Sequence, residues 1–456
     1  MACTTTTNLN TRMHAIPKTE LSQLYQDAVL VTRKLGLQYL WIDSLCILQD
    51  SRGDWERESV LMGQVFGNSD ITISAVAAED GSSGFLGPRN THVVRTKYRT
   101  HRGQPSEGYM YFRRQANLPA VYYVLNKRAW IIQERVLAPR ILTFTKDKVF
   151  WECREMTARE TGEQHAAVEH TSQNIIPMLQ DLFAGGTDTS KIQLYAAWRQ
   201  LVREASEAGL TYESDRLHAI ASIAQLIQSS LQTEYICGTW IDDLALEMEW
   251  YPRSTCRRPV VARAPSWCWS SLEGPIHFGL HNDLTRCIVH FENLHRSLPT
   301  LTIDHPSDSP LRSPEPSWAL HVRAHVAICE VALKTVYWNH DSGLQLISPE
   351  YEDFNSAAKA GGLATFNEMG QLICISFFDL QPKAPWVSRY ICMLLFEDDD
   401  TRWGSPRSRY GMGLLLTTTT KPEDAYHTYT RVGTVHFGKT GLDYLLTCDT
   451  QCVTLL

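Results

Sequence analysis

The sequence predicts a protein whose N-terminal part is an α/β domain with a parallel sheet and flanking helices. Three observations lead to this prediction. A short apolar run lies between two amphipathic helical patterns, a second apolar run follows them, and the chain from residue 257 onward consists of short β-rich runs. Alternating helix and strand patterns are typical of parallel sheets with crossover helices. We therefore expect an α/β domain over residues 1–165, a helical segment over 166–256 and a β-rich region over 257–456.

The first elements follow from apolar periodicity. Residues 19–35 carry apolar side chains at three- and four-residue spacing, which predicts an amphipathic helix that Gly36 ends. The apolar run Tyr39–Ile42 predicts a buried strand of a parallel sheet. Asp54 is placed to cap a second helix, and residues 70–76 read as the next strand.

The middle of the α/β domain contains a long connection and a hairpin. Residues 79–120 are rich in Gly, Arg and Ser, which predicts an irregular connection or a peripheral hairpin. A helix over Asn126–Leu137 should stop before Pro139. The runs Ile141–Thr145 and Lys148–Glu152 then alternate around a two-residue turn, which indicates a β-hairpin.

The rest of the chain divides into helices and strands. Helical patterns cover residues 194–208 and 216–231. The β-rich runs, separated by turn residues, are Leu320–Val326, Ile328–Val336, Leu372–Phe378, Tyr390–Phe396, Met412–Thr418 and Thr428–Val435.

Bulk properties exclude several classes of protein. The 456 residues are 43% hydrophobic and 20% charged, as in globular proteins, and a net charge of −7 gives no reason to expect nucleic-acid binding. No apolar run reaches membrane-spanning length and the N-terminus does not resemble a signal peptide, so we expect a cytoplasmic protein. The twelve cysteines are scattered, which favours reduced thiols, and no set of Cys and His has the spacing of a metal site.

Several sequence blocks stand out by their composition and order. They are Leu35–Asp50 (LGLQYLWIDSLCILQD) with Asp54–Glu58 and Met62–Phe66, then Arg128–Arg140 (RAWIIQERVLAPR), Phe150–Cys153, Thr211–Ala219 and Ala264–Ser270. In this order they resemble the fungal HET (heterokaryon incompatibility) domain family. The similarity is highly specific in its first half and covers roughly residues 15–275. HET domains usually begin with a strand that carries Leu-Ser-Tyr-x-Trp-Gly. Here only the Thr-rich residues 4–7 correspond, so this member is expected to lack that strand, or its start is assigned late.

The resemblance implies a role in nonself recognition and programmed cell death of filamentous fungi. Signalling would then pass through self-association or through binding of another fungal signalling protein. HET domains are also proposed as distant relatives of TIR domains, some of which assemble and some of which hydrolyse NAD. From this resemblance we expect no cofactor, and NAD would take part only as a possible substrate.

The predicted strand end carries the first candidate site residues. Asp43, Ser44 and Cys46 follow the apolar run, and strand carboxyl ends face the ligand crevice in open α/β sheets. Asp43 could act chemically, with Ser44 binding a ligand, or it could simply accept backbone N–H groups. Cys46 is a weaker catalytic candidate, since no histidine occurs between His14 and His92 to activate it. A packed, inert thiol is the preferred interpretation.

The second group of candidates lies on the predicted helix before Pro139. Gln133 falls within its apolar side, so its amide should bind another element or a ligand. Glu134 falls at the border, where a carboxylate could stabilise the oxocarbenium-like charge that forms when a glycosidic bond breaks. The alternative is an ion pair with Arg128, Arg135 or Arg140. Arg128 could also bind a phosphate group.

Three hypotheses remain open from the sequence. The first is a HET-type signalling protein, the second is an NAD(P)-hydrolysing enzyme that uses Glu134 and Asp43, and the third is an enzyme of fungal specialised metabolism with a small-molecule ligand in the same cleft. The sequence contains no dinucleotide-binding glycine motif, P-loop, zinc-protease motif or serine-hydrolase elbow. None of these common catalytic motifs therefore identifies a substrate.

Overall fold

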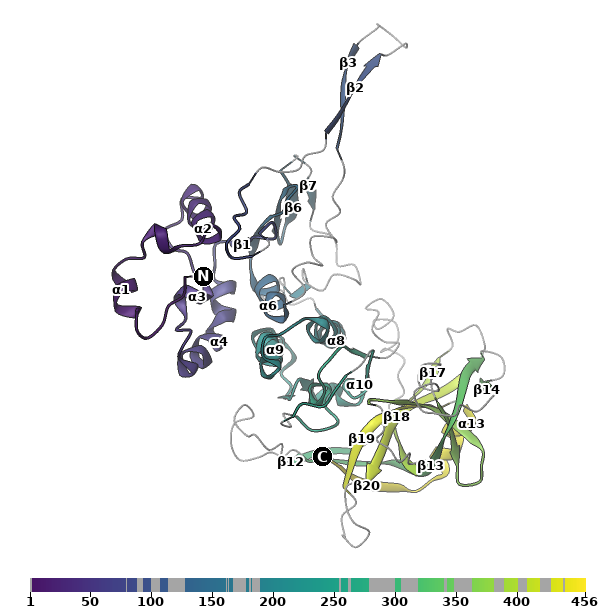
Figure 1. Ribbon diagram of the computed structural model, residues 1–456. Coiled ribbons are helices and arrows are strands. Elements are labelled where there is room, and N and C mark those ends of the chain that lie inside the picture. The colour runs from purple at the N-terminus through teal and green to yellow at the C-terminus, as the bar shows by residue number, and fades with distance from the viewer. Residues whose placement is uncertain are drawn as a thin grey trace. The chain divides into compact units, whose positions relative to one another are not determined.

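The structure is a computed structural model of the chain (Figure 1). It describes residues 2–78, 80–87, 93–99, 107–113, 128–160, 162, 164–166, 178–179, 182, 189–253, 256–260, 264–278, 300–304, 319–339, 343–347, 363–380, 389–400, 408–418, 428–437 and 439–456. The chain forms two compact units. Unit 1 consists of Met1–Thr187, Ala208–Leu210 and His218–Leu226, and unit 2 consists of Asp188–Glu207, Thr211–Leu217 and Ile227–Leu456.

Unit 1 begins with α1 (Leu9–His14), the short 3-10 helix η1 (Lys18–Glu20) and α2 (Gln23–Lys34). The Ser22 hydroxyl caps α2 by accepting the N–H of Tyr25 at 3.4 Å. Gly36 follows the helix with a φ of +77°, a conformation that glycine adopts without a steric cost. The predicted first helix and its glycine stop are confirmed.

The predicted strand Tyr39–Ile42 is wrong. These residues belong to no helix or strand, and the tyrosine is 89% exposed. The chain instead forms the one-turn helix α3 (Asp43–Cys46) directly afterwards. A buried strand needs a neighbour for its backbone groups, but the next strand, β1 (Thr72–Ser74), pairs with a later one. Within the run, Trp41 makes a tertiary contact, with its ring 5.7 Å from the ring of Phe66.

The Thr-rich N-terminal residues lie beside α3. The N–H of Thr4 donates to the carbonyl oxygen of Ser44 at 2.8 Å, and the N–H of Gln49 donates to the carbonyl oxygen of Thr4 at 2.9 Å. Thr4 and Leu48 form an isolated parallel bridge. The Thr-rich residues that remain of the family's first region thus satisfy one backbone group within α3 and one after it.

Helix α4 (Arg52–Gly67) starts earlier than predicted. The Ser51 hydroxyl caps it by accepting the N–H of Asp54 at 3.3 Å, so the prediction of Asp54 as the cap is wrong. The Asp54 carboxylate instead accepts the N–H of Leu48 at 2.8 Å and pairs with Arg57 at 2.8 Å. One side of the helix is buried, with Ser59, Met62 and Phe66 in the interior.

The sheet of unit 1 has the strand order β1-β4-β5-β6-β7. Its further strands are β4 (Arg140–Phe144), β5 (Val149–Cys153), β6 (Met156–Arg159) and β7 (Gln164–Ala166). Only β1 and β4 are parallel, and helix α6 (Ala129–Leu137) immediately precedes β4. The later pairs are antiparallel, so the predicted parallel sheet is limited to one pair, whereas the predicted β4–β5 hairpin is confirmed.

The long connection after β1 contains a second sheet of two strands. Strands β2 (Val93–Arg99) and β3 (Glu107–Arg113) pair antiparallel, from Val93 opposite Arg113 to Arg99 opposite Glu107. Of the two structures predicted for this connection, the described residues form the peripheral hairpin. The first two residues of the helix predicted before Pro139, 126 and 127, lie outside the described part of the chain.

The middle of the chain is helical with short two-stranded sheets. The two long helices, α8 (Lys191–Glu207) and α9 (His218–Leu231), confirm the predicted helical patterns. The shorter elements are η2 (Glu213–Asp215), β8 (Tyr235–Ile236), β9 (Thr239–Trp240), η3 (Ile241–Asp243), α10 (Leu244–Glu247), β10 (Trp250–Pro252), η4 (Trp269–Ser271) and β11 (Ile276–Phe278). Five tryptophans of this segment are completely buried: Trp198, Trp240, Trp250, Trp267 and Trp269.

The C-terminal region is a closed six-stranded barrel with additional strands. The ring runs β13-β15-β16-β19-β18-β17 and returns to β13, with every pair antiparallel. These strands are β13 (Ala319–Asn339), β15 (Leu363–Asn367), β16 (Leu372–Phe378), β17 (Arg389–Asp400), β18 (Ser408–Thr418) and β19 (Thr428–Phe437). Strands β12 (Thr300–Asp304), β14 (Gly343–Ile347) and β20 (Thr450–Leu455) pair with the long β13.

Helix α13 (Lys439–Thr447) contributes to the core of the barrel region, where Leu442 and Leu445 are buried with Val331 and Phe437.

The elements of the whole chain confirm the α/β, helical and β-rich character of the three predicted regions. The region boundaries at 165 and 256 and the distant TIR likeness stay predictions. Among the described residues, no helix has both the length and the apolar character that crossing a bilayer requires.

The completely buried Arg431 of β19 ties the barrel to the chain around β10. Its Nε and Nη2 bind the two carboxylate oxygens of Asp379 at 2.9 and 3.0 Å. The other donors reach the carbonyl oxygens of Met248 and Trp250, and the guanidinium lies 3.5 Å from the centre of the Trp250 ring. A planar group with five N–H donors suits these partners, and lysine could not reproduce the arrangement.

Candidate functional site

The N-terminus of α3 holds the first predicted site residues. Asp43 is exposed, and one of its carboxylate oxygens accepts the N–H of Ser44 at 2.7 Å. The Ser44 hydroxyl is half-buried and lies 2.7 Å from the hydroxyl of Tyr25 on α2. Asp43 therefore lies at the surface and binds the backbone of the next residue, while the Ser44 hydroxyl joins α3 to α2. The backbone-accepting role considered for Asp43 is present.

Glu134 on α6 is electrostatically linked to Asp43. Removal of water around the carboxyl group is the main effect, and the negative charge of Asp43 adds to it. Together they raise the pKa of Glu134 from 4.5 to about 7, against the opposing positive charge of Arg128. The fold thus brings the two predicted acidic residues near each other from distant parts of the sequence. At neutral pH a carboxyl group with this pKa can either donate or accept a proton.

Gln133 lies on the other side of α6 and is completely buried. Its Oε1 accepts the N–H of Ser222 on α9 at 3.3 Å, which confirms that this amide ties the helix to another element. Its Nε2 is also buried and has no hydrogen-bond partner among the described residues. Gly63 of α4 approaches the same part of α9, because a Cβ at this glycine would lie 2.3 Å from the Cβ of Ser222. Gln133 therefore holds a tight helix contact and does not face an exposed cleft.

The arginines near α6 have different surroundings. Arg128 is exposed and precedes the first helical residue, and the next N–H, of Ala129, donates to the carbonyl oxygen of Gly209 at 3.1 Å. Arg135 lies 3.8 Å from the carboxylate of Glu152 on β5. Arg140 donates to the carbonyl oxygen of Asp70 at 3.2 Å. Arg128 is thus the arginine whose charge acts on Glu134, and it is accessible to a ligand.

Cys46 differs from the preferred prediction of a buried thiol, because the residue is exposed. It occupies the end of the one-turn helix α3. Removal of water by neighbouring atoms raises the pKa of the Cys46 thiol, and the carboxylates of Asp43 and Glu58 raise it further, although a hydrogen bond involving Ile42 opposes them. These surroundings disfavour the nucleophilic thiolate, so Cys46 lacks the electrostatics of a catalytic cysteine.

An aromatic row beside the site was not predicted as a functional feature. The ring of Trp55 on α4 lies 6.3 Å from the ring of Trp130 on α6 and 5.8 Å from the imidazole of His218 on α9. The buried Nδ1 of His218 has no hydrogen-bond partner within the described ranges. His218 is thus a titratable group near α6 that sequence spacing gave no reason to single out. Its occurrence in the block Thr211–Ala219 was the one available signal.

A comparison with protein families identifies the region that contains these residues. Residues 2–134 match the family model described as Heterokaryon incompatibility protein (HET). The chain carries a HET domain. Neither the search of curated proteins nor the search of solved structures gave a match to this chain.

The matched region places the site within the family domain. Asp43, Ser44, Cys46, Arg128, Gln133 and Glu134 all lie within residues 2–134. His218 and Ser222 of α9, which contact Trp55 and Gln133, lie beyond the matched residues.

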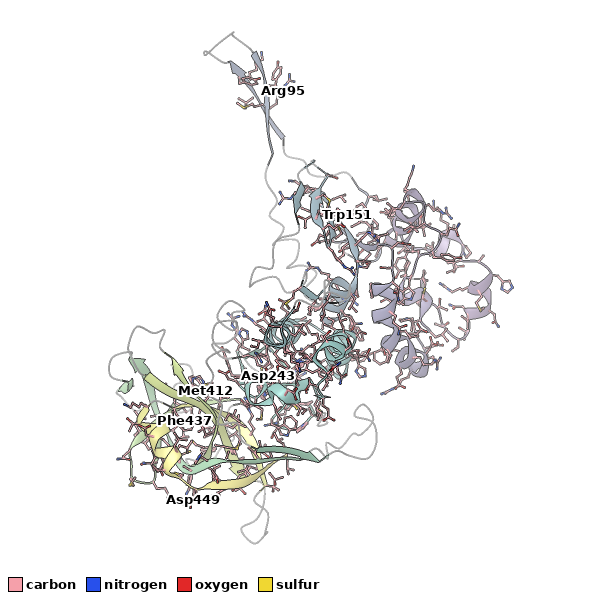
Figure 2. The ribbon with its side chains drawn as sticks, turned by 180° about the vertical axis from the view of Figure 1, so that it is seen from behind. Arg95, Trp151, Asp243, Met412, Phe437 and Asp449 are labelled. Carbon is pink, nitrogen blue, oxygen red and sulfur yellow. The ribbon has the colours of Figure 1, made fainter. Side chains whose placement is uncertain are left out.

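Unit 2 contains a second group of buried charges. Arg199 of α8 binds Asp243, and its Nη1 lies 3.5 Å from a carboxylate oxygen of Glu247. Burial raises the pKa of Glu247 well above its ordinary range and that of Glu249 to about 8. All four side chains are buried, and Figure 2 labels Asp243. The raised pKa values favour the neutral forms of Glu247 and Glu249, which reduces the excess negative charge around the single guanidinium of Arg199. This behaviour is typical of a structural ionic cluster.

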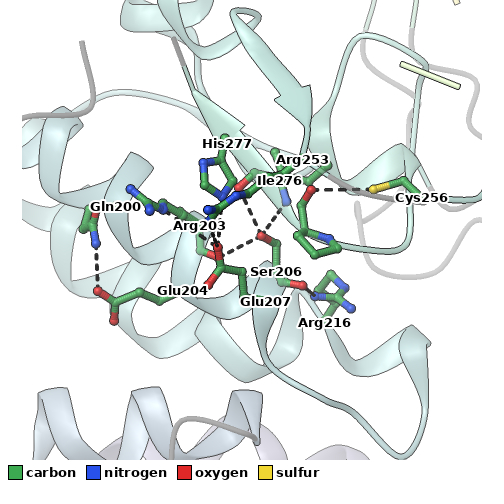
Figure 3. A network of polar contacts seen from close by, with 11 residues as sticks. Gln200, Arg203, Glu204, Ser206, Glu207, Arg216, Arg253, Cys256, Ile276 and His277 are labelled. Carbon is green, nitrogen blue, oxygen red and sulfur yellow. Dashed lines mark hydrogen bonds and ion pairs between the residues drawn. The ribbon is translucent and has the colours of Figure 1, made fainter. Parts of the chain in front are cut away.

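A polar network joins the end of α8 to β11 (Figure 3). The Glu207 carboxylate lies 2.9 Å from Nε2 of His277 and 3.7 Å from Arg253. The Ser206 hydroxyl accepts the N–H of Ile276 at 2.8 Å. Burial lowers the pKa of His277 despite the nearby Glu207, so this imidazole is neutral at neutral pH. The network fixes the strand β11 to the end of helix α8.

Among the described residues, no three His, Cys, Asp or Glu side chains are arranged to hold a metal ion.

Proposed function

We propose that this HET domain protein acts in heterokaryon-incompatibility-type nonself recognition and programmed cell death in a filamentous fungus. The family match supports this role, and the surface of α4 supports a mechanism through self-association or partner binding. Val60 and Leu61 are adjacent on this helix and are 53% and 41% exposed, whereas the opposite side of α4 is buried. Adjacent exposed apolar side chains are a common feature of interaction surfaces.

The association state of the full chain tests this mechanism. Light scattering after size exclusion should show wild-type oligomers whose fraction rises with concentration. The double variant Val60→Ser/Leu61→Ser should be monomeric with an unchanged circular dichroism spectrum. Glu56→Gln, an exposed change on the same helix, is the matched control and should associate like wild type. A folded wild-type protein that stays monomeric, alone and with fungal extract, contradicts the proposal.

A second candidate function is hydrolysis of the N-glycosidic bond of NAD or NADP, and the charge relationship of Asp43 and Glu134 favours it. In this reaction nicotinamide leaves the ribose as a neutral molecule and an oxocarbenium-like sugar forms. The Asp43 carboxylate would stabilise the positive sugar. Glu134, with a pKa of about 7, would take the proton of the attacking water. The products are ADP-ribose, or its phosphate, together with nicotinamide and one proton. The exposed Arg128 is available for a phosphate of the dinucleotide.

Consumption of NAD by the purified full chain tests the second candidate. If the pair is catalytic, the wild type and Glu56→Gln should release nicotinamide at similar rates. Glu134→Gln should release it at least ~100-fold more slowly, while keeping the same melting behaviour. If Glu134→Gln releases nicotinamide as fast as wild type, Glu134 is not the base. Absence of turnover in a folded wild type rejects NAD as the substrate. The same pair would then serve either signalling alone or a specialised-metabolism substrate of another class.

A further inference from the structure

The hairpin β2–β3 has two chemically different faces. In the antiparallel register Lys97 lies opposite Tyr109, and Thr96 lies opposite Met110. Because side chains alternate across a strand, Arg95, Lys97 and Tyr109 share one face, while Tyr98 and Met110 share the other. Neither strand pairs with any other strand in the described part of the chain. In the described part of the chain the hairpin thus has no sheet neighbour at either edge, and side chains on both of its faces are exposed.

The first face is cationic and aromatic. The Arg95 guanidinium lies 3.4 Å from the centre of the Tyr109 ring, and the Lys97 ammonium lies 5.9 Å from it. All three residues are exposed (Figure 2 labels Arg95). Residues 93–113 contain five Lys or Arg and one Glu, a net charge of +4, although the whole chain has a net charge of −7. This local positive charge is complementary to an anionic partner.

The opposite face carries the large side chains of Tyr98 and Met110 beside Thr96. Tyr98 is 37% exposed and Met110 is 45% exposed. The Tyr98 ring covers Gly108, where an added Cβ would lie 2.8 Å from the ring. Isolated two-stranded hairpins are only marginally stable in water, since they have no core in which to bury such side chains. A partner that accepts apolar side chains and also attracts positive charge would stabilise this hairpin.

We propose that the β2–β3 hairpin binds the surface of a membrane that contains anionic lipids. Tyrosine and methionine enter the interfacial layer of a bilayer favourably, and tyrosine is enriched at this depth. Arg95 and Lys97 remain at the level of the headgroups and contact their negative charges. Single-stranded nucleic acid explains the surface less well. Arg95 already occupies a face of the Tyr109 ring on which a base would stack, and nucleic-acid binding leaves the apolar side without a role.

Sedimentation of the full chain with lipid vesicles tests the proposal. Wild type should bind vesicles of phosphatidylcholine mixed with phosphatidylserine, should bind phosphatidylcholine alone weakly, and should dissociate as salt is raised. Arg95→Glu/Lys97→Glu should lower the partition coefficient roughly 30-fold or more. Tyr98→Ser/Met110→Ser should lower it about tenfold and keep the salt dependence.

A matched control separates this surface from overall charge. Arg52→Glu/Arg389→Glu changes the net charge equally at two exposed arginines outside the hairpin, and it should bind within about threefold of wild type. Equal binding to both lipid mixtures overturns the proposal. A lack of wild-type binding to phosphatidylserine overturns it, as does an Arg95→Glu/Lys97→Glu variant that binds like wild type. Single-stranded RNA that displaces wild type from vesicles at equimolar concentration would assign the surface to nucleic acid instead.

Discussion

The carboxylate of Asp43 lies close enough to Glu134 to raise the pKa of its carboxyl group. Burial is the larger cause, and the two together move the pKa of Glu134 from 4.5 to about 7. A carboxyl group whose pKa is higher in the folded than in the unfolded protein stabilises the fold fully below pH 4.5. This contribution is lost as the pH rises through about 7.

Glu134→Gln should therefore remove part of the pH dependence of stability. We expect the wild-type α6 region to lose up to about 3 kcal/mol of stability between pH 5 and pH 8 because of this group. The variant should lose much less, since glutamine does not ionise. Hydrogen exchange of α6 peptides in urea measures the stability of this region at both pH values. Glu56→Gln is the exposed control, and equal pH dependence in all three proteins would contradict the assigned pKa.

Two glycines of α4 should respond oppositely to alanine. Gly63→Ala places a Cβ 2.3 Å from that of Ser222, so we expect a loss of about 1–3 kcal/mol. At Gly53 the nearest atom to an added Cβ is the end of the Arg57 side chain at 3.8 Å. Gly53→Ala should thus stabilise by up to ~1 kcal/mol through helix propensity. Urea unfolding of both variants measures the difference. A Gly63→Ala protein as stable as wild type would show that α4 and α9 do not pack this tightly.

Arg431→Lys should destabilise unit 2 strongly, although it keeps the charge. Lysine cannot bind both oxygens of Asp379, reach the two backbone carbonyls and stack on Trp250 at once. We expect a loss of about 3 kcal/mol or more. Arg389→Lys changes an exposed arginine that pairs with Glu368 at 2.9 Å, and it should stay within about 0.5 kcal/mol of wild type. Similar melting of the two variants in calorimetry would argue against the Arg431 contacts.

The cysteines should differ sharply in reactivity toward iodoacetamide. Cys46 is exposed with a raised pKa, so its alkylation should be slower than that of an ordinary thiol at pH 7 and should accelerate as the pH rises. Asp43→Asn/Glu58→Gln removes two carboxylates that raise this pKa and should speed the reaction. Cys392 is completely buried and should react only after unfolding. Peptide mass spectrometry follows both sites, and a Cys46 rate that is the same in the variant would contradict the assigned charge effects.

Periodic patterns in the sequence predicted most of the individual elements. Helix α2, the β4–β5 hairpin and four of the six barrel strands follow local alternation or helical spacing, which each segment carries in itself. The predicted runs Leu320–Val326 and Ile328–Val336 form the single strand β13, and β15 was not predicted. The run Tyr39–Ile42 fails because apolar composition cannot reveal whether a partner strand is available. The closure of the barrel likewise depends on the pairing of β13 with β17, two strands far apart in sequence.

The candidate site was predictable in part. Helical spacing placed Gln133 in a buried contact and Glu134 at the border of the apolar side. Asp43 was expected at the end of a strand, whereas it begins the short helix α3. The His218 contact could not be predicted, because the residue reaches Trp55 from a helix more than a hundred and fifty residues further along the chain. Cys46 was misjudged because cysteines are usually buried, whereas this one is exposed at the end of α3.

Viability of a filamentous fungus after induced expression tests the central claim most directly. The wild-type chain and the variants Val60→Ser/Leu61→Ser and Glu134→Gln should be expressed in folded form. Immunoblotting verifies that their levels are equal. We predict that wild type and Glu134→Gln kill the cells, while Val60→Ser/Leu61→Ser does not. Survival with folded wild-type protein would contradict a role in cell death. Killing by the α4 variant but not by Glu134→Gln would contradict signalling through this surface and assign the effect to catalysis.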